Sequence, residues 1–115
     1  TDVVIPSMID GKKVVGIADY AFVTGNNSNY VGLGITSVII PNTVKSIGEY
    51  AFYGNKLIEL TISNNVTYIG YSAFKNNKLT EVKFPSTPLI IGCTSTFSNN
   101  ATEIEYPSNV IFHCS

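Results

Sequence analysis

Apolar residues recur at a fixed interval of 22 positions through the middle of this chain. The segments Ile35–Lys56 and Leu57–Lys78 repeat the interval completely, and a third copy begins at Leu79. The apolar columns that share the interval are Val38, Leu60 and Val82; Ile40, Ile62 and Phe84; Ile47 and Ile69; and Phe52 and Phe74. A fixed period of this size predicts small supersecondary units, here called rows, which stack because one row cannot bury its own apolar face.

Each row combines two patterns. In the second full row the apolar Leu60 and Ile62 alternate with the polar Thr61, which predicts a short strand with one buried face. The pattern V-x-x-I-G-x-x-A-F then spaces apolar groups by three or four, which predicts a short helical or 3-10 arc. Gly48 and Gly70 lie in this arc, where a crowded or left-handed backbone would need glycine. We therefore expect an α/β repeat solenoid, with short parallel strands on one face and short helical or 3-10 arcs on the other.

The rows predict a single domain, residues 1–115, of about five coils. Its expected parts are an irregular first row (1–34), three regular rows (35–56, 57–78 and 79–100) and a truncated last row (101–115). In the first row, Asp10-Gly11 predicts a β-hairpin turn, and the Asn- and Gly-rich insertion Val23–Gly34 predicts a surface loop. Because Thr1 directly precedes a strand-like segment, we expect the chain to be a piece of a longer protein.

Composition narrows the function classes. Charged residues make up 13% of the chain and the formal net charge is −1, so no basic field is available to hold a nucleic-acid backbone. No apolar run approaches the roughly 18 residues that a membrane span needs. Two Cys and one His cannot form a closed four-ligand zinc site. His113 is alone, and no phosphate loop or nucleophile motif occurs, so we expect no catalysis, no cofactor and no resident metal.

The repeated pattern resembles the BspA-like leucine-rich repeats, also called the Treponema pallidum type, of secreted and surface proteins in bacteria and some protozoan parasites. The resemblance rests on Val38–Phe52, Leu60–Phe74 and Val82–Phe97, and on the opening segment Ile5–Val14. It implies a right-handed leucine-rich repeat superhelix, an extracellular or cell-surface location and a role in binding. The family's period is about 23 residues, with a Cys three positions after the Phe. Here the period is 22, and that position holds an asparagine that can bond to the turn backbone: Asn55, Asn77 or Asn100.

The outward strand positions are the first candidate site. Parallel rows place equivalent residues about 4.8 Å apart in ladders. One predicted ladder is Asp2, Ser37, Glu59, Glu81 and Glu103, and the other is Val4, Ile39, Thr61, Lys83 and Glu105. Like charges in register repel one another, which favours an acidic strip for a cationic partner or a weakly held Ca²⁺. The alternative is a solvated sheet face that Lys83 partly neutralises.

Three further features are candidates. The loop Val23–Gly34 offers Asn26, Asn27, Asn29 and Tyr30 for binding, and its alternative is a tolerated insertion. Tyrosines on the arcs offer a recognition surface or simply cover neighbouring rows; they are Tyr20, Tyr50, Tyr53, Tyr68 and Tyr71. Cys93 and Cys114 lie 21 positions apart, close to one row, so a disulfide between neighbouring rows is feasible.

These features together favour a non-catalytic, surface-exposed module for protein–protein interaction or adhesion. The expected partner is a host or extracellular matrix protein, or a neighbouring domain. Two alternatives remain, a structural spacer that displays parts of a larger surface protein and a targeting module attached to an enzyme. The last row has no evident cap, so we expect another domain or a second copy of the chain to cover it.

Overall fold

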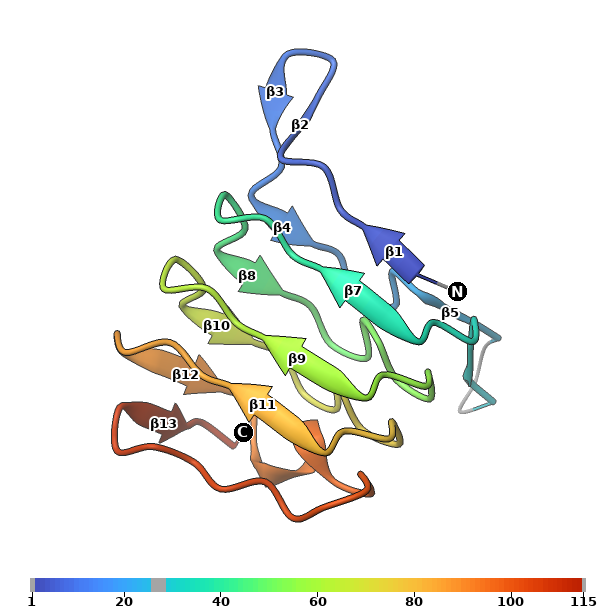
Figure 1. Ribbon diagram of the computed structural model, residues 1–115, viewed down its shortest axis with the longest axis vertical. Helices are drawn as coiled ribbons and strands as arrows, with labels where there is room; N and C mark the ends of the chain where they lie inside the picture. Colours follow the sequence, from blue (N-terminus) through green and yellow to red (C-terminus); the bar gives the residue numbers. More distant parts are fainter. Residues whose placement is uncertain (1, 26–28, 115) are drawn as a thin grey trace.

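The computed structural model describes residues 2–25 and 29–114. Four short strands, one from each of the first four rows, follow one another along one side of the molecule (Figure 1). They are β1 (Asp2–Val4), β7 (Ser37–Ile39), β9 (Glu59–Thr61) and β11 (Glu81–Lys83). We call this side the strand face. Its outward residues are exposed, whereas the inward Leu60 and Ile62 are buried, as their alternation predicts.

The pairing register confirms the predicted alignment of the rows. Val3 lies opposite Val38 in the parallel pair of β1 and β7, so the irregular first row aligns as its sequence predicts. Leu60 lies opposite Val82 in the parallel pair of β9 and β11, at the 22-residue interval. The strand face is nevertheless not one sheet. Among the described residues, β1 pairs with β7 and β9 pairs with β11, but no ladder joins β7 to β9.

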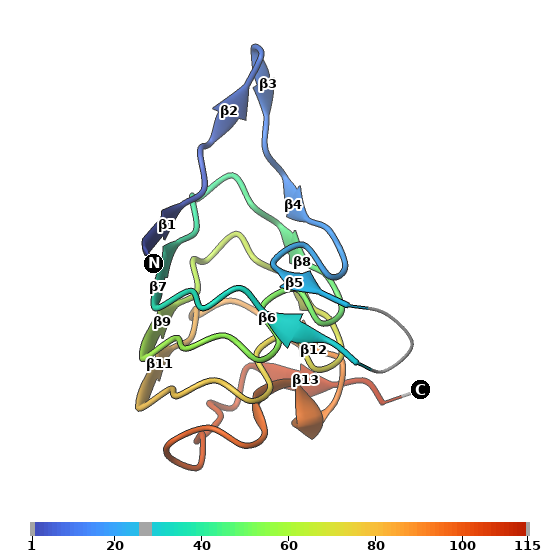
Figure 2. The same ribbon diagram turned by 90° about the vertical axis from the view of Figure 1, so that its right-hand side faces the viewer.

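A second, five-stranded parallel sheet stands where helical arcs were predicted. Its order is β13 (Val110–Phe112), β12 (Leu89–Ile91), β10 (Tyr68–Ile69), β8 (Ser46–Ile47) and β4 (Gly16–Ile17). Figure 2 shows β8, β12 and β13 on the opposite side of the molecule from the strand face. The helical prediction was therefore wrong for nearly every row, and the only helix of the described residues is a single 3-10 turn, η1 (Thr94–Phe97).

Backbone geometry explains why the arcs are not helical. The residue after each strand bonds to the neighbouring row instead of its own turn, as when the Gly70 amide donates to the Ile47 carbonyl at 2.8 Å. Tyr50 and Ser72, at equivalent positions, then adopt left-handed φ angles of 55° and 57°, which end any helical run. The close approach also fixes the glycine, because a Cβ on Gly70 would lie 2.6 Å from the Glu49 nitrogen. The predicted need for glycine is confirmed.

Two hairpins project from the first row. Strands β2 (Met8–Ile9) and β3 (Lys12–Lys13) pair antiparallel through Asp10 and Gly11, which confirms the predicted turn. Strands β5 (Val23–Thr24) and β6 (Val31–Gly32) also pair antiparallel. The insertion Val23–Gly34, which contains both strands, was predicted as a surface loop. The structure corrects this prediction at the two ends of the insertion, which pair with each other.

The core contains one continuous aromatic stack. Phe52 and Phe74 are fully buried, and Phe22, Phe52, Phe74 and Phe97 stack in that order with ring centroids 4.8, 5.3 and 5.3 Å apart. Stacked aromatic pairs of this kind add about 0.5–1.5 kcal/mol each beyond the area that they bury. The stack therefore ties four rows together through the interior.

The predicted asparagine bonds accompany this stack. Asn77 accepts a bond from the Leu57 amide at 3.0 Å and donates to the carbonyls of Phe52 and Phe74 at 2.9 and 3.1 Å. Asn55 and Asn100 make equivalent bonds in their own rows. Each amide bridges two successive rows, which confirms the structural role expected for this column.

The fifth row departs from the predicted ladders. No strand is assigned to residues 98–109, although Glu103 and Glu105 are exposed as expected. Tyr106 packs instead against the end of the core, with its ring 5.6 Å from Phe84 and 4.8 Å from Phe112. This segment covers the core rather than pairing with β11, so the described ladders end at Glu81 and Lys83.

Candidate functional site

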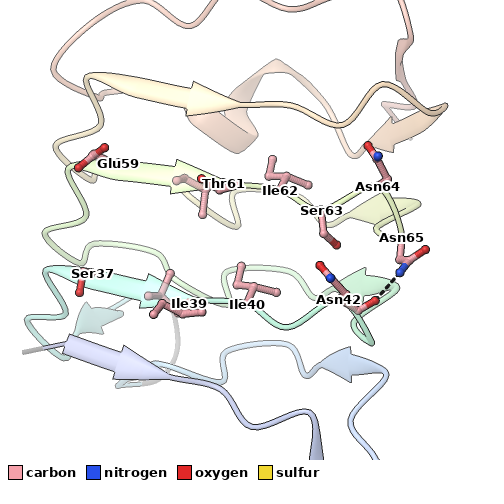
Figure 3. Close-up of a pocket in the computed structure, with 12 residues that line it drawn as sticks. Ser37, Ile39, Ile40, Asn42, Glu59, Thr61, Ile62, Ser63, Asn64 and Asn65 are labelled. Carbon is pink, nitrogen blue, oxygen red and sulfur yellow. Dashed lines mark hydrogen bonds between the residues drawn. The ribbon is translucent and has the colours of Figure 1, made fainter.

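The break in the strand face forms an open groove of about 710 Å³ between β7 and β9. Figure 3 shows Ser37 and Glu59 at one end of this groove, and Asn42 and Asn65 at the other. Between these ends the groove is lined by the side chains of Ile39, Ile40, Thr61 and Ile62. Polar groups at both ends of a partly apolar channel can fix the orientation of a ligand while the middle part supplies contact area.

Hydrogen bonds fix the far end of the groove. The Asn65 side chain donates to the Asn42 carbonyl at 2.6 Å, drawn as the dashed line in Figure 3. Asn64 accepts a bond from the Ser86 amide at 3.0 Å and so connects this end to the following row. The Ser63 hydroxyl oxygen is buried beside them and has no hydrogen-bond partner among the described residues. The turn is therefore bonded to both neighbouring rows, and one hydroxyl near it has unused bonding capacity.

The near end of the groove is acidic. Glu59 lies directly opposite Glu81 in the β9–β11 pair, as the ladder predicts. On the other side, Asp2 accepts hydrogen bonds from the Ser37 and Thr36 hydroxyls at 2.6 and 3.4 Å, which lower the pKa of its carboxyl group. Lys83 is the next outward residue after Glu81, opposite the exposed Thr61. Three carboxylates thus line up along this edge of the strand face, and Lys83 stands in the adjacent ladder.

A second set of residues meets at the turns that follow β4, β8 and β10. Tyr50 is at the centre of this tyrosine cluster, with ring centroids of four other tyrosines between 5.2 and 6.1 Å away: Tyr20, Tyr30, Tyr53 and Tyr71. Tyr20 and Tyr50 stack with an interplanar angle of 8°. The sequence suggested the arc tyrosines and the insertion as separate candidates. In the structure, the ring of Tyr30, a residue of the insertion, packs against the rings of Tyr20 and Tyr50. Asn29 is exposed, and Asn26 and Asn27 lie outside the described residues.

Electrostatics within the cluster raise the pKa of Tyr20 to about 12. The largest cause is a hydrogen bond to Tyr30, followed by partial desolvation and by the nearby charges of Tyr30 and Glu49. All of these favour the protonated phenol over the phenolate. The signal that could have revealed the Tyr20–Tyr30 contact is weak, because the two residues are joined by an insertion whose length does not fit the repeat.

The two cysteines meet at the end of the stack. Cys93 and Cys114 form a disulfide with their Cα atoms 4.8 Å apart. The bond joins the segment that follows β12 to the segment that follows β13, and β12 and β13 are neighbouring strands of the five-stranded sheet. A cross-link closing a loop of this size stabilises by about 3 kcal/mol in the chain-entropy model.

Within the part of the chain that the structure describes, no group of three or more His, Cys, Asp or Glu side chains converges in a way that could hold a metal ion. No helix within 2–25 and 29–114 has the length and apolar character to cross a membrane.

Comparison with protein families identifies one match. A model described as a BspA type leucine-rich repeat region matches residues 17–113 with six copies. No curated protein and no solved structure gives a significant match.

Proposed function

Because the chain belongs to the BspA-type leucine-rich repeat family, we propose that it is a surface-exposed module that binds a protein partner, or mediates adhesion, through its strand face. This family is a non-enzymatic type of repeat module, and leucine-rich repeats generally serve as protein-interaction or structural units. The proposal goes further by assigning the binding role to one face and to one place on it.

The observation that carries the proposal is the groove between β7 and β9. Its volume, about 710 Å³, is within the range of ligand pockets, roughly 300–1,000 Å³. Two large apolar side chains of this face are open to solvent: Ile39, which lines the groove, is 62% exposed, and Val4, opposite Ile39 in the β1–β7 pair, is 67% exposed. An apolar centre with a polar rim is the usual anatomy of a protein interface. The strand face therefore has both the shape and the composition for a partner.

The charge on this face favours a partner with basic residues. The carboxylates of Asp2, Glu59 and Glu81 stand along one edge, and Lys83 is next to them in the neighbouring ladder. Complementary charge would raise the association rate more than the final affinity. The weakly held Ca²⁺ that the sequence also suggested is not proposed for this edge, because no three His, Cys, Asp or Glu side chains of the described residues converge on a metal site.

We place the module outside the cell or on its surface. The Cys93–Cys114 disulfide supports this, because such bonds persist in oxidising compartments and are rare in the cytosol. We also infer that the stacked rows follow a right-handed superhelix, because connections between parallel strands of one sheet are right-handed in about 98% of cases.

Surface plasmon resonance against a panel of purified extracellular matrix proteins tests the proposal. At least one protein should bind saturably, and Ile39→Asp and Glu59→Lys should each weaken that binding about tenfold or more, the effect of losing an interface anchor. Glu105→Lys makes the same charge change outside the groove and serves as the matched control. A structural spacer would bind no member of the panel saturably, and equal effects of Glu59→Lys and Glu105→Lys would remove the groove from consideration.

A further inference from the structure

A smaller pocket of about 340 Å³ lies at the turns after β8, β10, β12 and β13. Its lining comes from successive rows and consists of Glu49, Tyr68, Tyr71, Gly92, Cys93, His113 and Cys114. The strands that precede these turns lie side by side in the five-stranded sheet (Figure 1). The pocket shares no lining residue with the groove between β7 and β9.

Two features hold this pocket in shape without a ligand. Gly92 is buried, and a Cβ added to it would lie 2.8 Å from the Tyr71 nitrogen, so the backbones of two rows touch at the pocket wall. The Cys93–Cys114 disulfide forms another part of the lining and fixes two rows covalently. A preformed pocket binds more tightly because no ordering cost is left to be met on binding.

The walls offer aromatic rings that are half open to solvent. Tyr71 is 44% exposed and Tyr68 is 39% exposed. The ring of Tyr71 also packs 6.1 Å from that of Tyr50, at the edge of the tyrosine cluster, so its position is restrained on one side. Exposed tyrosine rings whose orientation is restrained attract cations through the negative face of the ring.

The charge of the pocket matches such a cation. Glu49 lines the pocket, and the backbone amide of Glu49 donates to the Asp19 carboxylate at 2.7 Å, which keeps a second carboxylate nearby, at the equivalent turn of the preceding row. Among the described lining residues there is no lysine or arginine, and His113 is the one basic side chain beside Glu49. A basic group from outside would therefore meet a carboxylate and two tyrosine rings in one place.

We propose that this pocket binds the side chain of an arginine presented by a partner protein. The guanidinium group is planar, stacks on aromatic rings and pairs with a carboxylate through two parallel hydrogen bonds, whereas a lysine ammonium does only part of this. Tyr68 and Tyr71 contact the plane of the group, and Glu49 accepts its hydrogen bonds. This second surface is independent of the strand face, so the module is able to hold two partner segments at once.

Titration of the ¹⁵N-labelled chain with the peptide acetyl-Gly-Arg-Gly-amide, followed by NMR, tests the inference. The amide signals of Glu49, Tyr71 and Gly92 should shift with saturation at millimolar peptide. The same peptide with citrulline, which keeps the shape and loses the charge, should bind at least about threefold more weakly. Equal affinity for the two peptides, or shifts confined to β7 and β9, would overturn the assignment.

Matched variants separate the pocket from general electrostatics. Glu49→Gln should weaken arginine-peptide binding about two- to fivefold, the range for one exposed charged pair. Glu105→Gln removes the same charge at an exposed position outside both the pocket and the groove and should leave the affinity unchanged. Tyr71→Leu keeps apolar area but removes the ring, and it should also weaken binding. Equal effects of Glu49→Gln and Glu105→Gln would show attraction by net charge alone and contradict the proposal, whatever the outcome for the strand face.

Discussion

Neighbouring rows are connected in different ways at the strand face and at the turns that carry the phenylalanine stack and the asparagine column, which we call the turn side. On the turn side, the phenylalanine stack and the asparagine column run without interruption. The single side chain of Asn77, for example, bonds to the backbone of Leu57, Phe52 and Phe74. On the strand face, the ladder is interrupted between β7 and β9. The rows are thus held together mainly through one side, and the other side tolerates a gap.

This difference separates residues that specify the fold from residues that are available for binding. Phe74 and Asn77 are buried and contact two rows, so their identity is set by the stack itself. Ile39 and Glu59 are exposed at the gap, where the fold places no such demand on the side chain. Substitutions on the strand face should therefore cost little stability, and the following predictions test that separation.

The largest expected effect is on the aromatic stack. Phe74→Ala should lower the free energy of unfolding by about 3–5 kcal/mol, because it leaves a cavity between two stacked rings in a fully buried site. Urea denaturation followed by circular dichroism measures this. Phe112→Ala, at a residue that is 38% exposed, is the control and should cost less than half as much. Similar losses at both sites would mean that the stack is not the main link between rows.

The asparagine column should show the next largest effect. Asn77→Ala should lower the free energy of unfolding by about 2 kcal/mol, since it leaves the Leu57 amide and two carbonyls without their buried partner. Asn65→Ala removes one exposed hydrogen bond, to Asn42, and should cost about 0.5 kcal/mol. Thermal unfolding of the two variants side by side gives the comparison. Equal costs would contradict a specific role of the turn side.

Changes on the strand face should hardly affect stability. Glu59→Gln should shift the free energy of unfolding by only a few tenths of a kcal/mol, and in the stabilising direction, because it removes repulsion from Glu81 in the opposite position. Chemical denaturation at low salt detects this, and high salt should reduce the difference. A destabilisation above about 1 kcal/mol, outside the range for surface substitutions, would show that Glu59 has a structural role.

The smallest effect concerns the tyrosine cluster at high pH. The pKa of Tyr20 is raised from 10.0 to about 12, so its protonated form contributes stability below about pH 10 that is lost as the pH rises toward 12. Phenolate absorbance should show Tyr20 titrating late together with Tyr106, whose pKa is raised by burial, and Tyr20→Phe should make that late step smaller. Tyr68→Phe, outside the cluster, is the control. A late step of unchanged size in Tyr20→Phe would assign it to other tyrosines.

Much of this architecture follows from the sequence because its determinants are local and repeated. The 22-residue interval gives the register of Leu60 with Val82, and one asparagine in each of the three regular rows gives the turn bonds. The helical arcs were predicted wrongly because a two-residue strand followed by tight turns produces the same spacing of apolar residues. The left-handed conformation at Tyr50 and Ser72 distinguishes a strand with tight turns from a helical arc, and neither tyrosine nor serine is a residue type that predicts this conformation.

The candidate sites were less predictable because they depend on departures from the repeat. The segments around Ser37–Ile39 and Glu59–Thr61 both fit the consensus, so nothing in them marks the break between β7 and β9. The pocket beside Glu49 combines residues from several rows, and its shape depends on the disulfide and on Gly92. The position of Tyr30 depends on how the insertion folds back. Such arrangements depend on contacts between residues far apart in the sequence, so no local pattern predicts them.

The break between β7 and β9 also has a consequence for how a ligand would act on the stack. Strands β8 and β10 remain paired on the opposite side, so the two rows beside the break share strand hydrogen bonds there and none between β7 and β9. A ligand that touches both Ile39 and Thr61 would therefore supply the link between these two rows that the strand face lacks.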